Sequence, residues 1–126
     1  MIIGIGTDII EIDRVRHAVG HDLFRKKVFT LAEQNYCDGR GVQAAASYAA
    51  RFAAKEAFFK ALGSGIFTKL TDVEVKNNSQ GQPEIFLFGA AEKFSKDKGV
   101  EKIFLSLSHS KDFATAVCLL CGKNIP

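Results

Sequence analysis

The chain has few cysteines and prolines and no tract of low complexity. Only three cysteines and two prolines occur among its 126 residues. A small, odd number of cysteines is typical of reduced thiols rather than of a disulfide framework, so we expect a cytoplasmic protein. No Pro/Ser-rich linker and no internal repeat divides the sequence. We therefore expect a single domain over residues 1–126.

A long hydrophobic run and a strong excess of one charge are also missing. The N-terminal stretch MIIGIGTDIIEI is apolar, but it has early acids and lacks a basic leader and a cleavage site. We therefore expect neither a signal peptide nor a membrane span. The net charge is +3, which falls short of the clustered basic excess of a nucleic-acid binder. It is compatible with an acidic partner or a phosphorylated ligand.

Apolar periodicity and turn residues predict a small α+β domain with an antiparallel sheet and a long central helix. Because several strands follow one another directly, antiparallel pairing is favoured over a parallel, doubly wound sheet. The expected strands cover residues 2–7, 71–76, 84–88, 102–108 and 113–120. The expected helices cover residues 9–19, 21–29, a short segment opened by a Thr30–Glu33 capping box, 42–62 and 89–98.

Charged side chains interrupt an otherwise apolar central helix in the segment RFAAKEAFFKALGSG. A helix that is apolar all round is buried, and buried charges are costly unless they are paired. Glu56 and Lys60 are neighbours at i, i+4, whereas Arg51 and Lys55 fall on a different face. An ordinary helix ion pair accounts for the spacing. A carboxylate for a hard cation, one turn from an ammonium for a phosphate, accounts for it equally.

Three further positions each allow a structural and a functional interpretation. Asp8 follows the first strand, where it caps a helix with Glu11 at N3 or binds a metal. The turn from Gly63 to Gly65 ends the central helix, either as a simple C-cap or as a source of free backbone amides. His109 lies in the loop between the last two strands, where it binds phosphate or caps a turn.

Four segments together resemble one family: GTDIIEI, RFAAKEAFFKALGSGI, GQP and SLSHS. In this order and over most of the chain, they are similar to the holo-acyl-carrier-protein synthases, the small bacterial-type 4′-phosphopantetheinyl transferases. The resemblance implies a Mg²⁺-dependent homotrimer with active sites between subunits. It would transfer 4′-phosphopantetheine from coenzyme A to a serine of apo-acyl carrier protein, release adenosine 3′,5′-bisphosphate and support fatty acid biosynthesis.

The resemblance also implies roles for matching residues. Asp8 and Glu56 are expected to bind Mg²⁺ and, together with Lys60 at the diphosphate, to be catalytic. Contacts to coenzyme A are expected from Arg51, Lys60, Gly63, Ser64, Gly65, Pro83, Ser108 and His109. The acidic carrier protein is expected to dock on the early helical region, at Arg14, His21 and Arg25.

The sequence departs from the family in two places, and two other functions stay open. Ala50 stands where many relatives have Gly, and Arg40 is the nearest replacement for a basic contact to the 3′-phosphate that relatives carry upstream of Arg51. A non-enzymatic coenzyme-binding module would not need both Asp8 and Glu56. An assembly protein would use the apolar helix only as a subunit interface.

Overall fold

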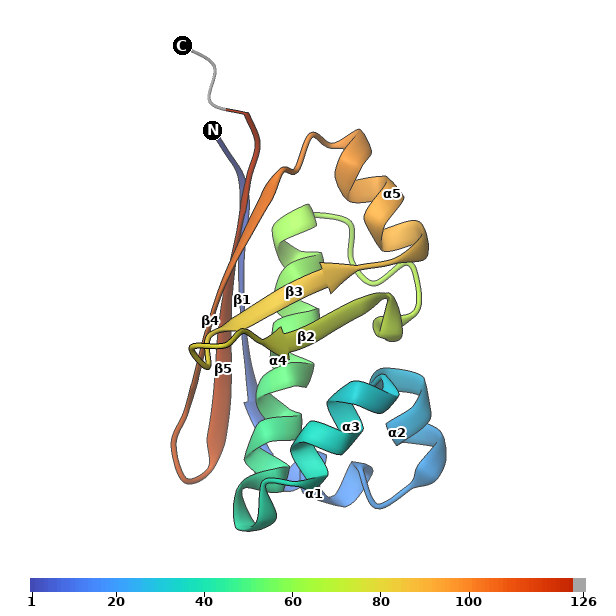
Figure 1. The fold of residues 1–126 in the computed structure, drawn as a ribbon, viewed down its shortest axis with the longest axis vertical. Coiled ribbons are helices and arrows are strands. Elements are labelled where there is room, and N and C mark those ends of the chain that lie inside the picture. The colour runs from blue at the N-terminus through green and yellow to red at the C-terminus, as the bar shows by residue number, and fades with distance from the viewer. Residues whose placement is uncertain (124–126) are drawn as a thin grey trace.

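The computed structural model describes residues 1–123, in which a long central helix lies against an antiparallel sheet (Figure 1). The three-stranded sheet has the order β1-β5-β4, and β2 and β3 form a separate hairpin. The strands are β1 (Ile2–Glu11), β2 (Val73–Asn77), β3 (Pro83–Leu87), β4 (Lys102–His109) and β5 (Phe113–Cys121). The helices are α1 (Ile12–Ala18), α2 (Asp22–Val28), α3 (Leu31–Asp38), α4 (Ala44–Leu62) and α5 (Gly89–Asp97). The predicted α+β class with antiparallel pairing is confirmed.

Two glycines allow α4 to pack directly on β1. A Cβ atom on Gly4 would overlap the carbonyl oxygen of Ala61, and one on Gly6 would overlap that of Ala57. The strand and helix backbones therefore approach more closely than any side chain would permit. This contact fixes the position of Asp8, two residues after Gly6, relative to α4.

The core surrounds α4 on more than one side, as its all-round apolar sequence predicts. One buried cluster joins Phe58, Phe59 and Leu62 to the sheet and the β2–β3 hairpin. A second cluster joins Tyr48 to Phe29 and to the first helices. Charged side chains on α4 are consequently tolerated only where the fold supplies partners or solvent.

The boundaries of α4 agree with the sequence at one end and differ at the other. A short 3₁₀ turn covers Gly41–Gln43, and the α-helix begins at Ala44 rather than Val42. The helix ends as predicted at Gly63, whose φ of 73° lies in the left-handed region that favours glycine. The capping box of Thr30 and Glu33 that opens α3 is also confirmed.

The prediction that Asp8 caps a helix is wrong. Strand β1 continues to Glu11, so Asp8 lies inside the strand, opposite Ala116 of β5. The backbone of this segment pairs with β5 as far as Glu11, which lies opposite Phe113. Helix α1 therefore begins only at Ile12. Ile9, which gave the apparent helical spacing, is 63% exposed on the outer face of the sheet.

The outer face of the three-stranded sheet is apolar and exposed. One face packs against α4, and the opposite face presents Ile5, Ile9, Phe104 and Val117, which are 66%, 63%, 49% and 42% exposed. An exposed apolar patch of this kind is typical of a contact surface. Within residues 1–123, no helix combines the length and the apolar character needed to cross a membrane.

Candidate functional site

An ion pair between strand and helix marks the candidate site. Lys60 Nζ lies 3.0 Å from Asp8 Oδ1 and donates a second hydrogen bond to the carbonyl oxygen of Thr7 at 3.1 Å. The Asp8 side chain is 11% exposed, whereas that of Lys60 is 56% exposed. The ammonium group is therefore held at the strand by its inner bonds and still reaches solvent, where it can meet an anion.

Glu56 and Asp8 line the same pocket. The pocket has a volume of about 540 Å³, and Arg14, Phe24 and Phe52 also line it. The Glu56 side chain takes part in no hydrogen bond or ion pair with residues 1–123. Burial raises the pKa of Glu56, the nearby charge of Asp8 raises it further, and Lys60 opposes both. The two acids that the resemblance assigns to one ion are thus brought together by β1 and α4.

The donor set of this pocket fits a hard divalent cation. Asp8 and Glu56 line one pocket, and the ammonium group of Lys60 is bonded to Asp8, so Glu56 is left without a bonded cation among residues 1–123. In the described part of the chain there is no group of three or more His, Cys, Asp or Glu side chains that could hold a metal. Mg²⁺ is commonly held by one or two carboxylates, with substrate phosphates and water completing its shell.

The expected docking residues differ in their surroundings. Arg14 is exposed and lines the pocket of Asp8 and Glu56. His21 is exposed and precedes α2. Arg25 donates to Asp38 Oδ2 at 2.8 Å, so its charge is already paired within the chain. Because α1 ends at Ala18 and α2 begins at Asp22, Arg14 and Arg25 lie on two separate helices.

Arg51 lies away from this pocket, as its place on another face of α4 predicts. It is 4% exposed, and its guanidinium carbon is 4.1 Å from the centre of the Tyr36 ring. One terminal nitrogen donates to Asn77 Oδ1 at 3.3 Å, while Nε has no partner within residues 1–123. Asn77 pairs with Pro83 across the β2–β3 hairpin.

Arg51 and Pro83 therefore form a second group of residues, which lies apart from Asp8 and Glu56 within one chain. Arg40, whose guanidinium lies 5.8 Å from the Tyr36 ring, belongs to this group too.

His109 lines another pocket, at the β4–β5 hairpin. This pocket has a volume of about 370 Å³, and Ser110, Lys111 and Arg16 also line it. Arg16 pairs with Asp13 on its own helix. The cations beside His109 are thus Arg16 and Lys111, not Arg40. Ser108 is exposed on β4, where its carbonyl oxygen accepts a hydrogen bond from Thr115.

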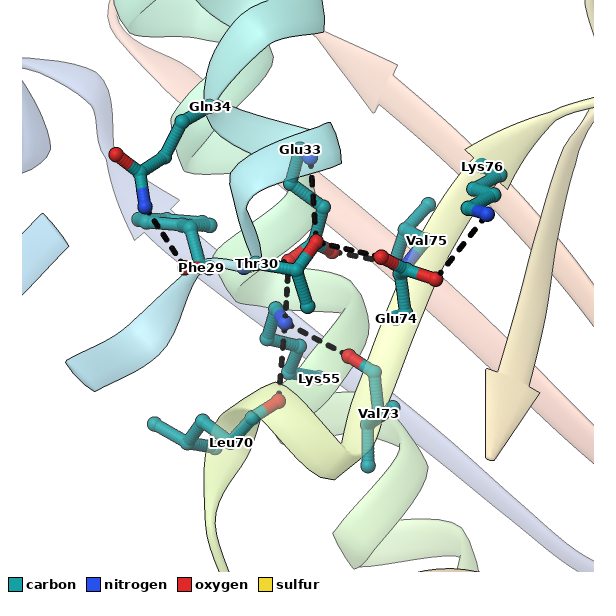
Figure 2. A network of polar contacts seen from close by, with 10 residues as sticks. All are labelled: Phe29, Thr30, Glu33, Gln34, Lys55, Leu70, Val73, Glu74, Val75 and Lys76. Carbon is teal, nitrogen blue, oxygen red and sulfur yellow. Dashed lines mark hydrogen bonds and ion pairs between the residues drawn. The ribbon is translucent and has the colours of Figure 1, made fainter. Parts of the chain in front are cut away.

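The partner of Lys55 could not be predicted from the sequence. Figure 2 shows the Lys55 ammonium group between α3 and the start of β2. It donates to Glu33 Oε1 at 2.8 Å, to the Leu70 carbonyl at 3.0 Å and to the Val73 carbonyl at 2.7 Å. Both charged side chains are fully buried. Burial lowers the pKa of Lys55, and the Glu33 carboxylate opposes that shift. Because all three ammonium protons are already donated within the chain, Lys55 has none left for a ligand, and its role is structural.

Glu33 does more than cap its helix. Its Oε1 also accepts from the Thr30 amide at 2.9 Å, and Oε2 accepts from the Val75 amide at 2.8 Å. Thr30 in turn donates its hydroxyl to Glu74 at 2.6 Å. The capping box was the signal available in the sequence, but a box alone does not reveal that its acid also faces a buried lysine.

Comparisons with known proteins show the family and the fold of the chain. The model of the 4′-phosphopantetheinyl transferase superfamily matches residues 4–118. The chain is 44% identical, over 95% of its length and 98% of the relative's, to a holo-[acyl-carrier-protein] synthase of Geobacter metallireducens. A solved synthase structure from Neisseria meningitidis matches with a TM-score of 0.87 at 31% identity, covering 95% of this chain and 98% of that one. A synthase structure from Bacillus anthracis in complex with CoA (3′,5′-ADP) matches with a TM-score of 0.81 at 36% identity, covering 98% and 99%.

Proposed function

The chain belongs to the 4′-phosphopantetheinyl transferase superfamily, and we propose that it is a holo-acyl-carrier-protein synthase. It transfers 4′-phosphopantetheine from coenzyme A to a serine of apo-acyl carrier protein and releases adenosine 3′,5′-bisphosphate. The observation that carries this proposal is that Asp8 and Glu56 line one pocket and that Lys60 forms an ion pair with Asp8. The relative from Bacillus anthracis, solved with CoA (3′,5′-ADP), supports the choice of coenzyme.

The three residues would divide the chemistry between them. Asp8 and Glu56 would hold Mg²⁺, which supplies neutralisation of the phosphate oxygens during transfer. Lys60, fixed by Thr7 and Asp8 but open to solvent, would bind the diphosphate. Glu56 has no protein partner of its own in the described residues, so we propose that it accepts the proton of the attacking serine.

We propose that the active enzyme is a homotrimer with coenzyme A between subunits. On one chain, Arg51 and Pro83 lie with Asn77 and Tyr36, apart from the pocket of Asp8. A neighbouring subunit would bring the nucleotide contacts of one chain to the catalytic acids of another. The exposed apolar face of the three-stranded sheet supports such association, since a lone chain would leave it in water.

The carrier protein would dock at the mouth of the same pocket. Arg14 is exposed there and can attract an acidic partner. His21 is a weaker candidate, and Arg25 would first have to leave Asp38. The whole chain, residues 1–126, would act as one transferase domain, and we propose a cytoplasmic role in fatty acid biosynthesis.

Mass spectrometry of apo-acyl carrier protein tests the proposed function. With coenzyme A and Mg²⁺, we expect the carrier to gain the mass of phosphopantetheine and adenosine 3′,5′-bisphosphate to appear in equal amount. Chelation of Mg²⁺ should abolish both. Coenzyme A binding without any mass gain would instead indicate a binding module. Absence of both binding and transfer would leave only an assembly role.

A further inference from the structure

The turn after α4 is an unfavourable place for a phosphate unless a cation lies beside it. The last carbonyl groups of a helix carry about half a negative charge, and this end repels anions. The proposed contacts of coenzyme A nevertheless include Gly63, Ser64 and Gly65, which follow directly on this end. Some other group must therefore offset the negative end of α4.

Lys98, at the end of α5, occupies that position. Its Nζ donates to the carbonyl oxygen of Leu62 at 2.6 Å, the last residue of α4. The same Nζ lies 3.9 Å from where a Cβ atom of Gly63 would be. A full positive charge thus sits on the terminal carbonyl and against the first residue of the turn. It outweighs the partial negative charge of the helix end.

A second set of contacts holds α5 against the segment after the turn. The Phe94 ring lies 4.8 Å from the Phe67 ring, and Phe67 lies 5.7 Å from Phe59 of α4. Lys98 Nζ is 5.7 Å from the Phe94 ring centre. The turn is therefore fixed on both sides, by the ammonium group at its start and by the packed aromatic rings after its end.

The turn keeps donors for a ligand. The amides of Ser64 and Gly65 have no acceptor within residues 1–123, whereas the Gly63 amide is used inside the helix cap. Ser64 Oγ folds back onto the Gly65 carbonyl at 2.8 Å, which leaves the amides clear. Backbone amides in such a turn bind anions when the surrounding potential is positive.

We propose that Lys98 is a positioning residue for coenzyme A. It holds the turn from Gly63 to Gly65 and reverses the electrostatic sign of the α4 terminus, so that the turn accepts a phosphate of the coenzyme. This inference rests on the proposed function, because it concerns the coenzyme site of that reaction. Lys98 acts through Leu62 and the turn and takes no part in the transfer itself.

Steady-state kinetics of three variants test this role. Lys98→Met removes the charge and keeps a similar chain, Lys98→Arg restores a cation, and Lys96→Met removes an exposed cation from the same helix. For Lys98→Met we expect KM for coenzyme A to rise about tenfold, as loss of a charge-assisted hydrogen bond implies. The kcat and the KM for carrier protein should change less than about twofold. Lys98→Arg should recover most of the loss, and Lys96→Met should match the wild type.

Calorimetric titration with coenzyme A separates the possible failures. If the wild type transfers phosphopantetheine and Lys98→Met binds coenzyme A as tightly as the wild type, the role of Lys98 is wrong and the proposed function stands. If Lys96→Met weakens binding equally, the effect is one of net charge and the inference is overturned. If kcat and both KM values worsen together with the melting temperature, Lys98 is merely structural. If the wild type neither binds coenzyme A nor transfers, both proposals fall.

Discussion

The buried ion pair of Lys55 and Glu33 gives the sharpest prediction about stability. Lys55→Met leaves the Glu33 carboxylate fully buried without its cation and leaves the Leu70 and Val73 carbonyls without a donor. Breaking one side of a buried pair costs about 3–5 kcal/mol. A domain of this size is stable by about 5–15 kcal/mol in total, so the variant should be marginal.

Urea denaturation followed by far-ultraviolet circular dichroism measures this loss, and α4 itself supplies the control. Lys60→Met makes the same chemical change at a pair whose lysine is 56% exposed, and ion pairs open to solvent contribute about 0–1 kcal/mol. We expect Lys55→Met to lose several times more free energy of unfolding than Lys60→Met. Transfer activity should show the opposite order among the folded molecules, since Lys60 lies at the candidate site. Protein concentration must be matched, because subunit association also stabilises the folded state.

The reasoning is refuted if Lys55→Met unfolds within about 1 kcal/mol of the wild type, the range of an exposed pair. Equal losses for Lys55→Met and Lys60→Met would refute it too, since burial would then have no influence. Replacing Glu33 by Gln tests the pair from the other side. With its amide oxygen at the Oε1 position it still accepts from Thr30 and Lys55, but its amide NH₂ group then faces the N–H donor of Val75. We expect it to be destabilising, with a cost that is not additive with Lys55→Met.

Three further predictions concern the site and its surroundings. Glu56→Gln should lower kcat by about a hundredfold or more, as expected for a lost proton acceptor, and calorimetry should show a far smaller loss of coenzyme A binding. Arg14→Glu should raise KM for carrier protein several-fold, and added salt should shrink the difference; kinetics independent of salt would exclude docking there. Hydrogen bonds from Arg25 and Tyr48 lower the pKa of Asp38 below its ordinary 3.8. Asp38→Asn should therefore be less stable than the wild type at neutral pH, and their denaturation midpoints should converge as pH falls below 3.8.

Most elements of the fold could be predicted because their signals are local. The end of α4 at Gly63 depends on one residue that adopts a positive φ readily. The capping box at Thr30 and Glu33 is contained within four residues. The strands after α4 follow from alternation and turn residues, and their boundaries shift by two residues or fewer in β2 and β3.

The errors arose where distant segments decide the outcome. Asp8 and Glu11 have the spacing of a helix cap, but pairing with β5, more than a hundred residues later, extends β1 through both. Local spacing cannot report that competition. The partner of Lys55 is equally nonlocal, since Glu33 lies on another helix. The resemblance to a family assigned Asp8 and Glu56 to one site, and the fold places both at one pocket. Such a resemblance carries long-range information that spacing alone lacks.

The four charges of the central motif can now be distinguished by what surrounds each of them. Lys55 has acceptors for every ammonium proton, and Arg51 has a ring and an amide but an unpartnered Nε within the described residues. Lys60 uses two of its three ammonium protons, for Thr7 and Asp8, and the Glu56 side chain has no bonded partner there. A buried charge whose partners are complete cannot bind a ligand without breaking them, whereas one that lacks a partner is costly until a ligand arrives. The fewer bonded partners a charged side chain has within the chain, the more its substitution should affect transfer rather than folding. Substitution of Lys55 should therefore mainly reduce stability, and substitution of Glu56 should mainly reduce transfer activity.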